Sequence, residues 1–267
     1  MILEYKAGRT PNPDVFCNKY IKFGVFFDWA MNEGADFVAT GHYARVEKKG
    51  NDFLMLAGKD RNKDQSYFLW TLGQKQLSKT LFPVGDLEKS EVRKLAKKFK
   101  LPNAARKDSQ GLCFVGPVNV KDFLAEYAPQ QEGNVLDSDG KIIGRHPGAL
   151  FFTVGERHGF VVTEKTPNDA PYFVISKDMK KNTITVGHKN ESLSGMKKEF
   201  DLESVNWVVD APIKDKKYTA RVRHLGDCMS CVFDSNKVAF TDPVTVASGQ
   251  SIVFYDGDIC LGGGIIK

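Results

Sequence analysis

Two cysteines in loop-like segments are the side chains of this sequence best suited to nucleophilic chemistry. Cys17 lies in the string GRTPNPDVFCN (residues 8–18), where two prolines stiffen a loop that meets an apolar, helix-like stretch. A helix dipole favours the thiolate form of a cysteine placed near the N-terminus of a helix, and the thiolate is the nucleophile. Asp14, three residues earlier, either transfers a proton beside this thiol or caps the helix. Taken alone, Cys17 is better explained as a quiet buried residue.

Cys113 lies in the second segment, KDSQGLCFVG (residues 107–116), which is polar and contains glycines that allow a backbone to approach a substrate closely. Two thiols in such loops suit a sulfur relay, in which one cysteine carries a persulfide and the other resolves it. The alternative is that the two cysteines are functionally unrelated. The two segments, taken without further evidence, favour this alternative.

The other cysteines indicate neither a disulfide framework nor a metal site. Five cysteines at irregular spacing, with no secretory signal, argue against structural disulfides. Cys228 and Cys231 form a C-x-x-C pair, but no second Cys or His pair completes a zinc site, and in a strand the two sulfurs face opposite sides. We expect Cys260 to be packed and no metal to be bound.

Length and composition indicate two or three small domains in a cytoplasmic protein. The chain has 267 residues, 42% of them hydrophobic, which is enough for real cores. Its longest apolar runs fall far short of the roughly 20 residues that span a bilayer, so no membrane association is expected. The formal net charge of +5 suits a polyanionic partner without requiring one.

The elements that must position the two thiols change character along the chain. Apolar spacing predicts a helix over residues 18–32, a buried strand over 36–42 and an amphipathic helix over 92–99, whose basic face we expect to be solvated. Two hairpins follow, one around Asp139-Gly140 and one formed by residues 172–175 and 183–186. After a linker (189–199), short alternating strands from residue 201 predict a closed β-barrel.

Five strings, taken together, resemble the tRNA 2-thiouridylase family. They are GRTPNPDVFCN, VATGHYAR, KDQSYFL, DSQGLCFVG and GQSIVFYDGDICLGGGII, in the family's order and from one end of the chain to the other. The resemblance implies an α/β plus β fold with three parts. These are a partial Rossmann-like adenylation domain of the PP-loop ATPase type (1–120), a small β-rich central domain (121–190) and a C-terminal β-barrel that binds tRNA (198–267).

The family's chemistry is thiolation of the wobble uridine of tRNA, a sulfurtransferase reaction. ATP, with Mg²⁺, adenylates the oxygen at carbon 2 of the base, and sulfur then displaces AMP. By resemblance, Cys113 carries the persulfide, Cys17 is the nucleophile that releases its terminal sulfur, and the two end as a disulfide. The implied partners are tRNA and a persulfide donor such as a cysteine desulfurase or a relay protein.

The resemblance also assigns binding roles. Asn12, Pro13 and Asp14 would surround the target base, with Asp14 as the proton-transfer group, and Gly41 would contact the nucleotide. The remaining tRNA contacts would be His42, Lys63, Asp64, Gln65, Arg223, His224 and Gln250. The family usually has tyrosine at position 224, where imidazole can also stack.

The family's Ser-Gly-Gly-Val-Asp-Ser type loop, which grips the ATP phosphates, does not occur in the 267 residues. We therefore expect an N-terminally truncated form that binds ATP weakly, exposes apolar surface and self-associates. One alternative is a fragment that binds tRNA without performing chemistry. Another is a thiol–disulfide protein that uses Cys228 and Cys231.

Overall fold

A long helix near the N-terminus organises the first part of the chain. The computed structural model describes residues 1–105, 120–163, 170–188 and 196–267. After α1 (Ile2–Lys6), the helix runs through α2 (Pro13–Phe16), the π-helical η1 (Cys17–Val25) and α3 (Phe26–Asn32). The backbone departs from helical angles at Gly24, where the helix kinks. The predicted helix is confirmed, and it begins at Pro13, five residues earlier than its apolar spacing indicates.

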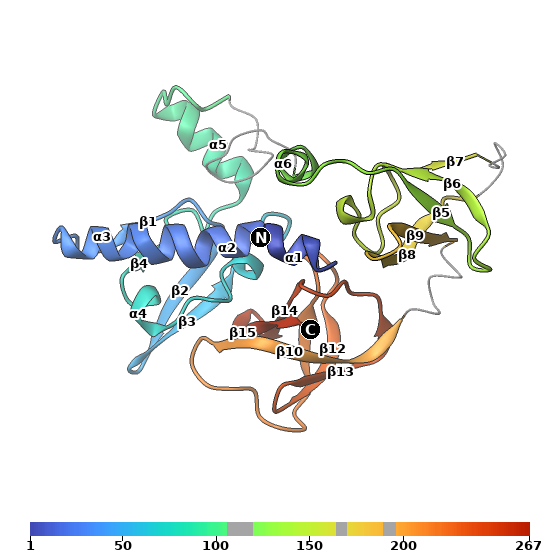
Figure 1. Ribbon diagram of the computed structural model, residues 1–267. Coiled ribbons are helices and arrows are strands. Elements are labelled where there is room, and N and C mark those ends of the chain that lie inside the picture. Colours follow the sequence, from blue (N-terminus) through green and yellow to red (C-terminus); the bar gives the residue numbers. More distant parts are fainter. Residues whose placement is uncertain (106–119, 164–169, 189–195) are drawn as a thin grey trace.

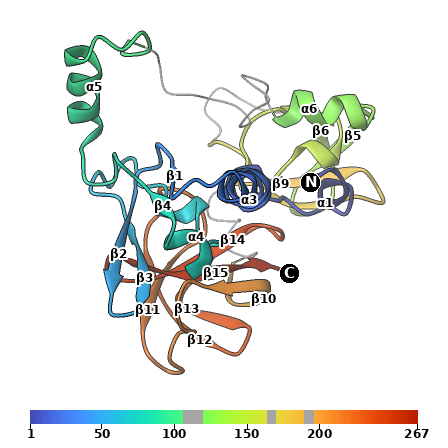
Figure 2. The ribbon, with the colours of Figure 1, turned by 90° about the vertical axis from the view of Figure 1, so that its left-hand side faces the viewer.

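Short strands and helices follow this helix. β1 (Val38–Ala39) pairs in parallel with β4 (Thr80–Leu81), and β2 (Ala44–Lys49) forms an antiparallel hairpin with β3 (Asp52–Ala57). The strand predicted over residues 36–42 is therefore too long, because the chain leaves the sheet after Ala39. The helical elements are η2 (Ser66–Phe68), α4 (Gln74–Leu77) and α5 (Lys89–Lys98). α5 has no buried residue and stands apart from the rest (Figures 1 and 2), as its predicted solvated basic face requires.

The C-terminal strands form the predicted closed barrel. Its six strands are β10 (Lys197–Trp207), β11 (Tyr218–Arg221), β12 (Met229–Asp234), β13 (Lys237–Val244), β14 (Ser251–Asp256) and β15 (Ile259–Ile266). They pair in the order β10-β13-β12-β11-β14-β15, and β10 pairs with β15 to close the barrel. Phe233, Phe240 and Phe254 are buried in its core.

The N-terminal part and the barrel share a sheet and a hydrophobic core. β3 pairs with β15 through Leu56 and Met55, which extends the barrel sheet by the β2–β3 hairpin. Phe23 and Phe27 of the long helix pack in one cluster with Trp70 and the barrel residue Tyr255. The helix therefore lies on the barrel (Figure 1), and residues at its start can meet barrel loops.

The central unit is a small sheet with one helix. It contains α6 (Val120–Tyr127), β5 (Gly133–Leu136), β6 (Ile142–His146), η3 (Ala149–Phe151), β7 (Val161–Val162), β8 (Phe173–Asp178) and β9 (Thr183–Gly187), in the sheet order β7-β6-β5-β9-β8. Both predicted hairpins are present as β5–β6 and β8–β9. Tyr5 of α1 is buried in this unit's core, so the N-terminus docks on it. Of the helices in the described residues, none combines the length and hydropathy of a membrane span.

One face of the long helix is apolar and exposed. Val25 is 71% exposed and Trp29 56%, and Tyr20, Ile21 and Phe26 are exposed with them. Phe37, just before β1, and Leu81 of β4 are exposed as well.

Candidate functional site

The segment around Cys17 begins the long helix and is fixed by its own side chains. Asn12 is the N-cap, and its Oδ1 accepts hydrogen bonds from the backbone nitrogens of Asp14 (3.1 Å) and Val15 (3.2 Å). Pro13 occupies the first helical position, where its missing N–H costs nothing. Asp14 lies in the first turn and is not the cap. Cys17 follows in the second turn, slightly beyond the helix end where the sequence places it.

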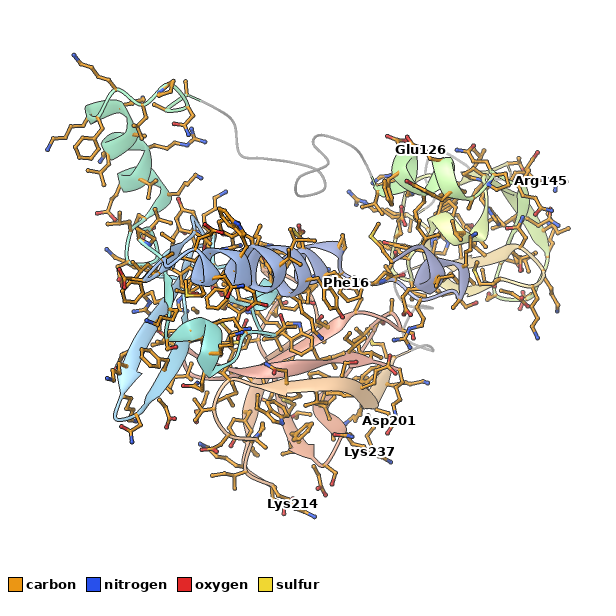
Figure 3. The ribbon with its side chains drawn as sticks, turned by 60° about the vertical axis from the view of Figure 1, so that its left-hand side comes forward. Phe16, Glu126, Arg145, Asp201, Lys214 and Lys237 are labelled. Atoms are coloured by element: carbon orange, nitrogen blue, oxygen red, sulfur yellow. The ribbon has the colours of Figure 1, made fainter. Side chains whose placement is uncertain are left out.

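Cys17 lines the larger of two cavities along this helix. Cys17 is buried, with only 9% of the residue exposed. The cavity has a volume of about 880 Å³, and its lining includes Pro13, Tyr20, Trp70 and Phe123. Phe16, labelled in Figure 3, marks this end of the helix, above the barrel and toward the central unit. A mostly apolar cavity of this size can enclose a base or a small ligand.

A second cavity of about 600 Å³ contains three of the predicted binding residues. Gly41, His42 and Gln65 line it together with Lys22 and Phe26. Gly41 leaves open space where a side chain would begin, because no atom lies within 4 Å of that point. Ile21 lines both cavities, so they adjoin along the helix.

His42 lies within the cavity lining and is not on the outer surface. Its Nδ1 is 2.8 Å from the Thr40 hydroxyl, and its ring packs against Phe23 and Phe82. Burial, reinforced by the positive charge of Lys22, lowers the pKa of His42 to about 3. The imidazole is therefore neutral at physiological pH, and it can act as a hydrogen-bonding group but not as a cation for phosphate.

Asp64 was predicted to contact tRNA, but the structure buries this residue. The residue is 0% exposed, and its Oδ1 accepts hydrogen bonds from the backbone nitrogens of Gly58 (3.1 Å) and Ser66 (3.0 Å). Its Oδ2 accepts from Arg221 of the barrel at 2.6 Å. This carboxylate thus organises its loop and joins it to the barrel, and it has no surface to offer RNA. The neighbouring Lys63 is half-buried.

Arg221 is a site residue that the sequence reasoning missed. It lies on β11 beside the Tyr255 ring and its side chain is 12% exposed. β11 ends at Arg221, so Arg223 lies beyond the strand and alternation along it does not relate the two arginines. Arg223 itself is exposed.

His224 brings the barrel next to the start of the Cys17 helix. Its Nε2 lies 2.8 Å from the Asp64 carbonyl oxygen, and its ring stacks on Phe68 with 4.3 Å between centroids. Burial lowers the pKa of His224, although the charges of Asp64 and Asp14 act in the opposite direction. Asp14 and His224 are therefore close enough to interact although they are far apart in the chain.

Gln250 also reaches the N-terminal loop. Its Nε2 donates a hydrogen bond of 2.7 Å to the carbonyl oxygen of Thr10. Of the predicted barrel residues, the structure thus places His224 and Gln250 beside the first segment. Cys113 lies outside the described residues.

The remaining cysteines differ from Cys17 in their surroundings. Cys228 is exposed just before β12, whereas Cys231 is buried within that strand. Burial raises the pKa of the Cys231 thiol to about 12 and does the same for Cys260. Neither buried thiol forms thiolate at neutral pH. Among the residues that the structure describes, no group of three or more His, Cys, Asp or Glu side chains could hold a metal ion.

Comparison with known proteins gives matches over nearly the whole chain. Three family descriptions match in succession: "tRNA methyl transferase HUP domain" over residues 1–117, "tRNA methyl transferase PRC-barrel domain" over 121–188 and "Aminomethyltransferase beta-barrel domain" over 197–266. The chain is 45% identical to a tRNA-specific 2-thiouridylase MnmA of Stutzerimonas stutzeri, a match that covers 100% of this chain and 73% of the relative. It is 48% identical to the protein of the same name from Geobacillus thermodenitrificans, covering 98% and 72%. A Pseudomonas putida relative of this name is 43% identical.

Proposed function

The chain belongs to the tRNA-specific 2-thiouridylase family, and we propose that it transfers sulfur to carbon 2 of the wobble uridine of tRNA. The observation that carries the proposal is the meeting of two distant segments at the start of the Cys17 helix. The charge of Asp14 acts on the His224 imidazole, and the Thr10 carbonyl oxygen accepts a hydrogen bond from the Gln250 side chain. We propose that residues 1–120 carry out the chemistry, that 121–190 form a central domain and that 198–267 contribute tRNA contacts.

Two thiols would perform the sulfur transfer. Cys113 carries a persulfide, and the Cys17 thiolate attacks its inner sulfur. The new bond is a Cys17–Cys113 disulfide, and the bond that breaks releases the terminal sulfur as hydrosulfide. Hydrosulfide then adds at carbon 2 of the uridine and displaces the activated oxygen. An external thiol reduces the disulfide before the next cycle.

The base would lie against the start of the helix. Asn12 is held as the cap, so Pro13 and Asp14 project from a rigid turn. Asp14 is the proposed proton-transfer group, because it places a carboxylate in the first turn of the helix, three residues before Cys17. His224, packed against Phe68, offers an aromatic ring nearby on which an RNA base can stack.

The second cavity fits a nucleoside better than it fits a triphosphate. Its volume and its lining by Gly41, Phe26 and the neutral His42 suit an adenine and its ribose. Among the described residues, the lining contains Lys22 as its cation and no glycine-rich backbone loop to hold phosphates. ATP, with Mg²⁺, would when bound convert the oxygen at carbon 2 of uridine into a leaving group. Gly41 would allow the nucleoside to approach the backbone.

The proposed RNA contacts form two groups. Lys63, His42 and Gln65 belong to the loops beside the second cavity, and Arg223, His224 and Gln250 come from the barrel. Arg223 is exposed and suits a phosphate. We assign Asp64 to holding these two groups together through Arg221.

A thiolation assay tests this proposal. Unmodified tRNA is incubated with the chain, ATP, Mg²⁺, cysteine and a cysteine desulfurase, and 2-thiouridine is measured by mass spectrometry. With ATP supplied in large excess to offset its weak binding, we expect product with the wild type, none with Cys17→Ser or Cys113→Ser, and an undiminished yield with the control Cys228→Ser. Product that persists in Cys17→Ser overturns the proposed role of Cys17.

The same preparation separates the alternatives. Retarded tRNA in a gel shift with no thiolation by the wild type identifies a fragment that binds tRNA without chemistry. Activity that depends on Cys228 and Cys231 identifies a thiol–disulfide protein, which the buried and protonated state of Cys231 disfavours.

A further inference from the structure

One turn of the barrel holds both backbone polar groups of a residue just ahead of the catalytic helix. The backbone nitrogen of Thr10 donates to the Ser248 carbonyl oxygen at 2.8 Å, and its carbonyl oxygen accepts from Gln250 Nε2 at 2.7 Å. Thr10 is 6% exposed, so these hydrogen bonds are largely shielded from water. We call residues 248–250 the barrel clamp.

Gly249 makes the close approach of the barrel clamp possible. Its φ of +90° is unfavourable for any residue with a side chain. A Cβ at this position would lie 2.9 Å from the Thr10 nitrogen and 3.1 Å from the Arg9 Cβ. Because the first contact is with backbone, the loop cannot relieve it by turning a side chain.

Further contacts hold the same loop from two sides. Arg9 is ion-paired with Glu4 and with Glu203 of β10. On the central unit, the Thr153 hydroxyl donates to the Thr10 hydroxyl at 3.3 Å. All three parts of the protein therefore meet at residues 9–10.

The connection from Thr10 to the helix is short and stiff. Only Pro11 separates Thr10 from the Asn12 cap, and Pro13 begins the helix. Each proline fixes its own φ and restricts the residue before it, so residues 10–13 have few free torsions. A displacement at Thr10 is therefore carried to the helix start, where Asp14 and Cys17 lie.

We propose that the barrel clamp positions Cys17 and Asp14, so that the barrel is part of the catalytic apparatus as well as an RNA-binding element. Gly249 and Gln250 are positioning residues that act through Thr10. The inference rests on the proposed function for the roles of Cys17 and Asp14. It adds that contact of RNA with Gln250 bears directly on the loop that begins the nucleophile helix.

Gly249→Ala and a matched glycine variant test the proposal. Gly257→Ala is the control, because Gly257 also lies in a barrel turn with positive φ (+60°) but has no atom within 4 Å of the added Cβ. The first readout is the rate of alkylation of Cys17 by iodoacetamide across pH, followed by mass spectrometry of its peptide. Alkylation of the exposed Cys228 in the same sample is the internal standard.

We expect Gly249→Ala to speed alkylation of Cys17 on the order of tenfold, because the buried thiol opens more often once the clamp is displaced. Thiolation of tRNA by the same variant should fall while the Kd for tRNA changes little. Gly257→Ala should leave all three values as in the wild type. A general loss of structure would speed alkylation of the buried Cys260 as well.

Gln250→Met, which removes the donor to Thr10, provides the second variant and should also speed alkylation of Cys17. Because Gln250 is also a proposed RNA contact, alkylation in the absence of tRNA is its readout. The proposed role of the barrel clamp is overturned if Cys17 is alkylated at the wild-type rate in both Gly249→Ala and Gln250→Met. If alkylation changes in these variants while Cys17→Ser still thiolates tRNA fully, the positioning role of the barrel clamp stands and the proposed function is overturned.

Discussion

Replacing Arg221 with methionine should destabilise the protein strongly, because it leaves a buried carboxylate without its cation. The Arg221 side chain is 12% exposed and that of Asp64 is fully buried, with 2.6 Å between Nη1 and Oδ2. Removing one partner of a buried ion pair costs about 3–5 kcal/mol. Asp64 keeps two backbone donors, from Gly58 and Ser66, so we expect the lower end, about 3 kcal/mol. Methionine preserves most of the packing of the aliphatic stem.

Urea unfolding followed by tryptophan fluorescence measures this loss, since Trp70 is buried in the core that the two units share. Lys216→Met is the control, because it breaks an exposed ion pair with Asp256 and should hardly change the midpoint. The double variant Asp64→Asn with Arg221→Met should recover part of the loss, since neither charge remains buried alone. A loss below about 1 kcal/mol in Arg221→Met, the range of surface pairs, would refute the reasoning.

Three further outcomes are expected. Because burial lowers the pKa of His42 to about 3, the unfolded chain takes up a proton below about pH 6.5 that the folded chain does not. Stability should therefore fall as the pH drops from about 6.5 toward 3, by about 2 kcal/mol between pH 7 and pH 5, and His42→Gln should flatten this dependence in urea titrations. At pH 8, iodoacetamide should modify Cys228 in the native protein and spare Cys260 until urea is added, and equal rates would contradict the burial argument. Val25→Lys with Trp29→Lys should reduce self-association in sedimentation velocity, since both side chains are exposed on one apolar face, and an unchanged sedimentation coefficient would remove that face as the cause.

Local patterns in the sequence predict most of the elements. Apolar spacing identifies the long helix, and Asp139-Gly140 marks a turn that the structure places in a hairpin. The helix start at Pro13 was missed, because capping by Asn12 and the proline fix it before any apolar repeat begins. The β2–β3 hairpin was also missed. Its first strand is mostly polar, and its pairing with β15 joins residues about 200 positions apart, which no local pattern encodes.

The candidate site divides in the same way. Cys17, Asp14 and the barrel residues are found from strings in the sequence, whereas their partners depend on long-range packing. Asp64 lies in a polar string, which predicts an exposed residue, yet its side chain is buried in an ion pair with Arg221. The bonding of Gln250 to Thr10 joins positions 240 residues apart and is visible only in the fold.

The central claim is that the thiols of Cys17 and Cys113 meet during sulfur transfer, and disulfide mapping tests it most directly without ATP or tRNA. The chain is loaded with persulfide by a cysteine desulfurase and cysteine, digested without reduction and analysed by mass spectrometry. A disulfide requires the two Cα atoms to come within about 7 Å. We predict a peptide in which Cys17 is linked to Cys113 and which disappears on reduction. A Cys17 thiol that stays free while Cys113 carries the persulfide, or links only to Cys228, would contradict the account.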